Sequence, residues 1–177
     1  IMIDHIKIDG AGTWTATPFA NPLGGGNSVG FTNALLGAYI TASSNIYIQN
    51  CEFTGLAVAI STATACSYLF INKNYVHGNG TSGFTIHTTD DSIITGNNIS
   101  NILGNMTAAG STDTDNSKFA DGILMADCHE MNVTNNRIAN CKRIGIVVEG
   151  LATDDCDNIV ISDNNITNMN TSRGTER

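Results

Sequence analysis

The chain has 177 residues, of which 41% are hydrophobic and 14% are charged, so it can form one continuous core, and we expect a single domain over residues 1–177. Abundant Gly, Asn, Thr and Ser disfavour a helical bundle, and recurrent Ile and Val disfavour disorder. The formal net charge of −8 argues against a nucleic-acid partner, which needs clustered Lys and Arg. No apolar run reaches membrane-spanning length, so no membrane partner is expected.

Along the chain, five segments repeat a pattern of alternating apolar residues followed by Asn. They are residues 46–53, 69–76, 92–99, 131–138 and 159–166, and a fainter copy lies at 6–8. Aligned on one another, the copies share an apolar column, then an Asn column three residues later, then a second apolar column two residues further on. These columns are Ile48, Ile71, Ile94, Val133 and Ile161; Cys51, Asn74, Asn97, Asn136 and Asn164; and Phe53, Val76, Ile99, Ile138 and Ile166. Alternation at period two predicts short strands.

A second strand is predicted before each of these segments. Its inward column is Ile40, Ile60, Ile86, Met125 and Val148. Three residues earlier the chain has a small residue in every copy, namely Gly37, Ala57, Gly83, Gly122 and Gly145. Small residues there let the chain turn into the strand.

The spacing of the repeat predicts a solenoid. Ile48, Ile71 and Ile94 follow one another at steps of 23 residues, which is too short for a strand–helix–strand unit. It suits one coil of three strands, each coil lying about 4.8 Å above the last. The later steps are longer, which indicates insertions at about 101–120 and 150–157, and a further insertion is expected at about 13–36, between the faint first copy and the first full one. Stacked Asn amides would satisfy the backbone groups at a sharp bend.

The five cysteines form no CxxC pair, and their odd number excludes complete pairing within one chain. We interpret them as small buried thiols, with metal ligation or a disulfide as the alternative. The chain opens directly on a strand pattern, so we expect it to be an excerpt of a longer helix.

These repeats, the Asn column and the opening residues 4–12 resemble the pectate-lyase superfamily of right-handed parallel β-helices. This group includes polygalacturonases, alginate epimerases and lyases, and bacteriophage tailspikes. The resemblance implies an all-β, right-handed parallel β-helix of about six coils with an Asn ladder, and a polysaccharide lying along the first sheet. The Gly-His-Gly and paired-Asp set of polygalacturonases is absent, as is the Asp-Pro-His motif of epimerases.

Candidate catalytic residues come from the outward side of the first strand of each coil. The outward columns are Tyr39, Ala59, Thr85, Leu124 and Val147, and then Thr41, Ser61, His87, Ala126 and Glu149, with Asp127 just beyond. We expect His87, Asp127 and Glu149 to form the catalytic group. Two carboxylates on adjacent coils suit glycoside hydrolysis, whereas His87 suits proton abstraction beside a uronate carboxylate. The alternative is that these are solvated polar residues on an exposed sheet.

Arg143 or Lys118 is expected to neutralise a substrate carboxylate. Asp121 and Tyr39 are further substrate-binding candidates on this face, and Trp14 could stack on a sugar ring or pack its loop against the coils. His77 and His129 are interpreted as surface or turn histidines. Asp113 and Asp115 resemble a loose calcium loop without the spacing of an EF-hand, so no metal and no cofactor is expected, with calcium as the alternative.

Two classes of function remain open from the sequence. The first is an extracellular carbohydrate-active protein, secreted or on a virion surface, that cleaves or modifies a polysaccharide as a lyase, hydrolase or epimerase. The second is a non-catalytic module of a tailspike or receptor-binding spike, which would be a homotrimer if the chain is a tailspike.

Overall fold

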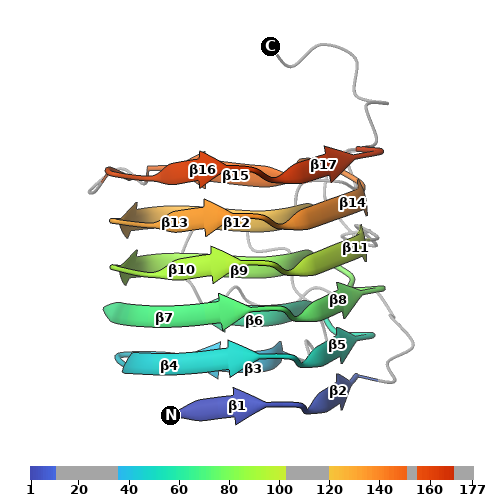
Figure 1. Ribbon diagram of the computed structural model, residues 1–177, viewed down its shortest axis with the longest axis horizontal. Coiled ribbons are helices and arrows are strands. Elements are labelled where there is room, and N and C mark those ends of the chain that lie inside the picture. Colours follow the sequence, from blue (N-terminus) through green and yellow to red (C-terminus); the bar gives the residue numbers. More distant parts are fainter. Residues whose placement is uncertain (11–35, 103–119, 151–154, 170–177) are drawn as a thin grey trace, which may run out of the picture.

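The computed structural model describes residues 1–10, 36–102, 120–150 and 155–169. In these ranges the regular secondary structure consists of β-strands alone (Figure 1). The described part of the chain therefore holds no helix of a length and hydropathy that could cross a membrane. The strands stack coil upon coil, from β1 at one end to β16 and β17 at the other (Figure 1).

Five coils each contribute one strand to each of three parallel stacks, and the described residues of the first coil contribute β1 and β2 to two of them. The first sheet contains β3 (Leu36–Ile40), β6 (Val58–Thr62), β9 (Ser82–Asp90), β12 (Asp121–His129) and β15 (Ile146–Glu149). The second contains β1 (Met2–Asp4), β4 (Ser44–Gln49), β7 (Cys66–Asn72), β10 (Ile93–Thr95), β13 (Asn132–Thr134) and β16 (Val160–Ser162). The third contains β2 (Lys7–Asp9), β5 (Glu52–Thr54), β8 (Tyr75–His77), β11 (Asn98–Ile102), β14 (Arg137–Cys141) and β17 (Asn165–Thr167).

The first and second sheets are continuous where strands run around the bend between them. The β9 residues Thr89 and Asp90 pair with Cys66 and Ser67 of β7, and the β12 residues Cys128 and His129 pair in turn with Thr89 and Asp90. All strand pairs are parallel, and the predicted all-β solenoid of three strands per coil is confirmed.

The predicted register of the second and third sheets is confirmed. Ile48 pairs with Ile71, Ile71 with Ile94, and the column continues through Val133 to Ile161. The column that starts at Phe53 runs through Val76, Ile99 and Ile138 to Ile166. Most of these side chains are fully buried and form the core.

The predicted register of the first sheet is wrong in one coil. Ile60 pairs with Ala38 and Phe84, two residues away from the expected alignment with Ile40 and Ile86. Thr62 takes the expected position of Ile60, because Ile40 pairs with Thr62. Likewise Ser61 aligns with Tyr39 and Thr85, and Ala59 takes the place expected for Ala57.

The physical reason is a threonine in an inward position. Thr62 is fully buried. Its hydroxyl donates a hydrogen bond to His87 O and accepts one from His87 N, both in the next coil. A pattern search for apolar residues passes over such a position, although a buried hydroxyl with partners is acceptable there.

The Asn column forms the predicted ladder. Asn97 Oδ1 accepts hydrogen bonds from both Asn74 N (2.9 Å) and Asn74 Nδ2 (3.0 Å), and Asn97 repeats this contact with Asn136. Asn136 in turn binds Asn164. The residue before each ladder position has a positive φ, namely Asn50, Lys73, Gly96, Asn135 and Asp163. The amide hydrogen bonds therefore stabilise a bend in which one residue per coil adopts the left-handed backbone conformation.

A second side-chain ladder lies at the bend between the first and second sheets. Its members Ser43, Cys66, Thr89 and Cys128 each donate to the carbonyl two residues earlier, at 2.7, 3.3, 2.8 and 3.3 Å. Cys156 follows in the last coil and contacts Cys128 N (3.3 Å). All five cysteines are free thiols, and four are buried. Three of them thus serve as small caps of this bend.

Candidate functional site

The strand register brings His87 and Glu149 to the same column of the first sheet. His87 of β9 pairs with Ala126 of β12, and Ala126 pairs with Glu149 of β15. Adjacent strands lie about 4.8 Å apart, so the Cα atoms of His87 and Glu149 are roughly 10 Å apart. Asp127 follows Ala126 at the start of the bend. The three candidate catalytic residues therefore lie on three consecutive coils of one sheet.

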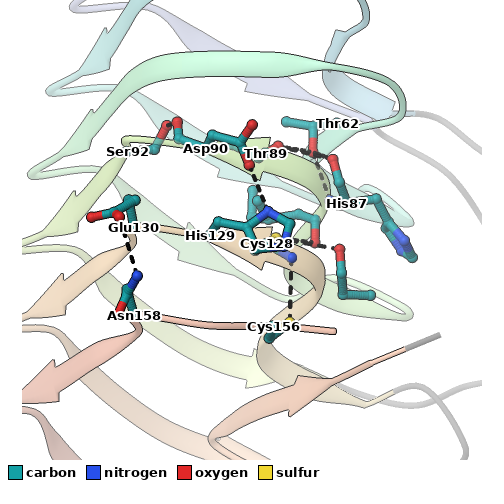
Figure 2. Close-up of polar contacts among 12 residues, drawn as sticks. Thr62, His87, Thr89, Asp90, Ser92, Cys128, His129, Glu130, Cys156 and Asn158 are labelled. Atoms are coloured by element: carbon teal, nitrogen blue, oxygen red, sulfur yellow. Dashed lines mark hydrogen bonds and ion pairs between the residues drawn. The ribbon is translucent and has the colours of Figure 1, made fainter. Parts of the chain in front are cut away.

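The backbone of His87 is fixed by threonines of its own coil and of the coil before. His87 N donates to Thr62 Oγ1 (2.7 Å), and Thr89 Oγ1 donates to His87 O (2.8 Å) (Figure 2). Figure 2 shows the imidazole projecting away from this group of hydroxyls. The position of the ring is thus set by a strand that is tied on both sides.

His87 is held toward its neutral form. Partial burial lowers the pKa of His87 below its usual value, and this effect outweighs the negative charges of Glu149 and Asp127, which act in the opposite direction. A neutral imidazole accepts a proton, and the two carboxylates stabilise the imidazolium that results. The arrangement is therefore suited to general-base chemistry.

Asp127 is 8% exposed and has φ 51°, whereas Glu149 is exposed. Positive φ is not special to Asp127, because Ala42, Ala65 and Thr88 adopt it at the same bend in other coils. The fold itself thus imposes this backbone geometry. The interpretation of Asp127 as a solvated surface residue does not fit its burial.

Burial of the outward side differs from what the sequence suggests. Ser61, Thr85, Leu124 and Ala126 point outward by register, yet all four are buried. Tyr39 at one end of this face is 50% exposed, and Glu149 at the other end is also exposed. We call the edge where the first-sheet strands enter the bend the rim. Along it, on three consecutive coils, His87 is half-buried, Ala126 is buried and Glu149 is exposed.

A family model described as "Right handed beta helix region" matches residues 23–110, about half of the chain. The match agrees with the stacked parallel strands of the structure. The chain is a right-handed parallel β-helix. No curated protein and no solved structure gave a significant match.

In this β-helix, Arg143 and Asp121 form an ion pair at the start of the first-sheet strands. Arg143 Nη1 lies 2.9 Å from Asp121 Oδ2, and Ile144 N donates to Asp121 Oδ1 (3.2 Å). Asp121 is fully buried, and this burial raises its pKa to about 6 although Arg143 opposes the shift. The geometry gives Asp121 a bracing role, and Arg143 is the member of the pair that reaches the surface.

Two other histidines of the β-helix, His129 and His77, each have an acidic partner on a neighbouring coil. His129 Nδ1 is 3.0 Å from Asp90 Oδ1 at the first bend (Figure 2). His77 Nε2 is 3.1 Å from Glu52 Oε1, and His77 stacks on Tyr75 with ring centroids 4.3 Å apart. Both are partly exposed and lie away from the His87 column, His129 on the bend and His77 on the third sheet.

Several predicted residues lie outside the described ranges. Trp14, Lys118, Asp113 and Asp115 do so, as do most of the predicted insertions. Within the described ranges, no three His, Cys, Asp or Glu side chains converge in a way that suits a metal ion. Sequence reasoning missed the buried Arg143–Asp121 pair, because charge alone does not show which carboxylate will be buried.

Proposed function

We propose that this β-helix binds an extracellular polysaccharide at the rim of its first sheet and that His87, Asp127 and Glu149 act on it. The observation that carries the proposal is the register of His87 with Glu149, together with the depressed pKa of His87. A half-buried histidine with a lowered pKa, followed by carboxylates on the next two coils, is a combination that is concentrated at functional sites. The protein would work outside the cell, secreted or on a virion surface.

The chemistry that this group suits best is proton abstraction beside a uronate carboxylate. His87 takes the proton from the carbon next to that carboxylate, and the electron pair forms a C=C bond as the glycosidic C–O bond breaks. The leaving oxygen takes a proton from the solvent or from a protonated carboxyl of the group. Arg143 keeps 26% of its side chain exposed. It is paired with Asp121, five residues along the strand from the His87 column, so it would bind the carboxylate of a neighbouring sugar unit. If the proton instead returns to the same carbon, the reaction is an epimerisation.

A non-catalytic role is the second candidate, and one observation favours it. Leu124 and Ala126 lie between the proposed catalytic residues and are buried, so a substrate chain could not lie flat against this part of the sheet. In that case the face would serve a spike or shaft without chemistry.

The test is a cleavage assay on a panel of uronate-containing and capsular polysaccharides. We expect the wild-type chain to release unsaturated or reducing ends from one member of the panel. His87→Ala and Glu149→Gln should each lower the rate about 100-fold or more, as expected for loss of general acid–base catalysis. Thr41→Ala is the matched control, because Thr41 is exposed at the same bend two coils away. Full activity in both site variants would remove the assignment, and no cleavage of any polysaccharide would favour the non-catalytic role.

A further inference from the structure

The coil that contains β6 and β7 is one residue longer than its neighbours at the bend beside His87. Ser61 pairs with Thr85 and Cys66 pairs with Thr89, so this coil advances five residues where the coil of β9 advances four. The coil of β3 and β4 is shorter by the same single residue, and the coils of β9 and β12 match residue for residue. The extra residue therefore forms a bulge in the coil of β6, and the bulge lies opposite His87.

The backbone of the bulge is bonded to the coil before it. Ala63 N donates to Ile40 O (3.1 Å), and Thr64 O accepts from Ala42 N (2.7 Å). These groups therefore point away from His87, which lies in the coil after the bulge. Since buried backbone N–H and C=O groups need partners, the regular strand pairing has to be replaced at His87.

The side chain of Thr62 provides the replacement. Its Oγ1 accepts a hydrogen bond from His87 N (2.7 Å) and donates one to His87 O (2.9 Å) (Figure 2). Thr62 is fully buried, and the other members of its inward column are all apolar, namely Ile40, Ile86, Met125 and Val148. The polar member of this column thus stands in the bulged coil, at the point where it reaches His87.

A bulge of this kind bears on the direction of a side chain. Bulges interrupt strand pairing, and they are common next to active sites, where they re-aim a side chain. The residue that this bulge faces is His87, and its imidazole projects away from the hydroxyl groups (Figure 2). The direction of the ring is therefore set by the backbone to which the Thr62 hydroxyl is bonded.

We propose that Thr62 is a positioning residue, which holds the imidazole of His87 in the direction needed to take a proton from the substrate. This inference rests on the proposed function and adds that the bulge, with Thr62, sets the direction of the base. A catalytic group that is held in place reacts without a further loss of freedom, and a displacement of about 1 Å can cost roughly 100-fold in rate.

The test compares Thr62→Val with Thr62→Ser, by NMR titration of the histidines and by the cleavage assay. Val keeps the shape of Thr but lacks the hydroxyl, so water is expected to reach the backbone of His87. Burial lowers the pKa of His87 in the wild type, and in Thr62→Val this pKa should rise toward its ordinary value. The kcat should fall about tenfold or more, with KM changed by less than about twofold. Thr62→Ser keeps the hydroxyl and should match the wild type.

Ser92→Ala is the matched control. The Ser92 hydroxyl is also buried between two backbone groups, since it donates to Asp90 O (2.7 Å) and accepts from Leu69 N (2.9 Å). Its loss should lower the melting temperature without moving the pKa of His87 or kcat. Circular dichroism establishes that each variant is folded at the temperature of the assay.

A milder variant keeps the test open if Thr62→Val does not fold. Thr62→Cys places a thiol, a weaker donor and acceptor, where the bend already holds the inward thiols of Cys66 and Cys128 in neighbouring columns. We expect changes in the same direction as in Thr62→Val, but smaller.

The outcomes separate this proposal from the proposed function. Failure of the proposed function would appear as a wild-type chain that cleaves no polysaccharide. An unchanged pKa of His87 and an unchanged kcat in the folded Thr62 variants would overturn the positioning role alone. Equal changes in Ser92→Ala would also overturn it, because Thr62 would then act only through the stability of the fold.

Discussion

At the scale of single residues, the buried amides of the Asn ladder contribute most clearly to the fold. Asn97 accepts two hydrogen bonds from Asn74 and donates to Asn136 and to the carbonyl groups of Ile71 and Thr95. No apolar residue can replace these contacts. The ladder could be predicted from the sequence because an Asn recurs in fixed register with buried apolar columns.

Replacing Asn97 by Leu should destabilise the protein by roughly 3 kcal/mol, because the backbone groups that it satisfies would stay buried without partners. Asn98→Leu is the control, since the Asn98 side chain points outward next to Arg137. It should change the free energy of unfolding by less than about 0.5 kcal/mol. Urea unfolding monitored by circular dichroism measures both, and equal effects would contradict the ladder as the source of the stability.

The raised pKa of Asp121 makes its contribution to the free energy of unfolding fall with rising pH, which is the opposite of what most carboxyl groups do. Its pKa in the folded protein is about 6, above the usual 3.8, so the folded state binds the proton more tightly than the unfolded state. The stabilisation is complete below about pH 4 and is lost as the pH rises through about 6, by up to about 3 kcal/mol. Unfolding measured from pH 4 to pH 7 should show this fall in the wild type and not in Asp121→Asn. The exposed Asp91→Asn should behave as the wild type, and a persistent slope in Asp121→Asn would contradict the assignment.

At the scale of strands, each first-sheet strand begins with a small residue that packs against an inward side chain of the third sheet. A Cβ atom on Gly83 would lie 2.4 Å from Gly122 O and 2.7 Å from Ile99 Cγ2. The coil before has Ala59 in this column and the smaller Val76 in the column of Ile99. Residue size in the two columns therefore varies together in these two coils.

Gly83→Ala should consequently destabilise the protein by about 1–3 kcal/mol through overpacking. Adding Ile99→Ala should recover part of this loss relative to the sum of the two single variants, because it removes the Cγ2 atom that the new methyl group would meet. Thermal unfolding of the two single variants and the double variant measures the coupling. Strictly additive effects would show that the two side chains do not compete for space.

Most strand positions could be predicted from the sequence, and the one error is instructive. In the second and third sheets the inward strand columns are apolar and are flanked by the Asn column, with Ser92 as an exception at the start of one copy, so the register is clear from the sequence. In the first sheet the inward Thr62 interrupts the apolar pattern, and the predicted alignment moved by two residues to Ile60. Because strand alternation has period two, this error kept the correct face but placed Ser61 in the wrong outward column.

At the scale of the whole molecule, the three faces of the helix differ in character. The first sheet carries His87 and Glu149 at its rim, and the second sheet carries Tyr47, Phe70 and Ile93 in one outward column. The third sheet carries the Lys7–Glu52–His77 cluster. The sequence predicted which residues share a coil and a column. It could not predict that Leu124 and Ala126 would be buried on the outward side, because burial there depends on contacts beyond the repeat.

The most direct test of the account is NMR of the histidine side chains during addition of an acidic oligosaccharide. The chain has four histidines, so each imidazole can be assigned by single substitution. The account predicts that the His87 signals shift on saturation while those of His77, on the third sheet, stay unchanged. A shift of His77 without His87, or no shift with any oligosaccharide of the panel, would contradict a polysaccharide site on the first sheet.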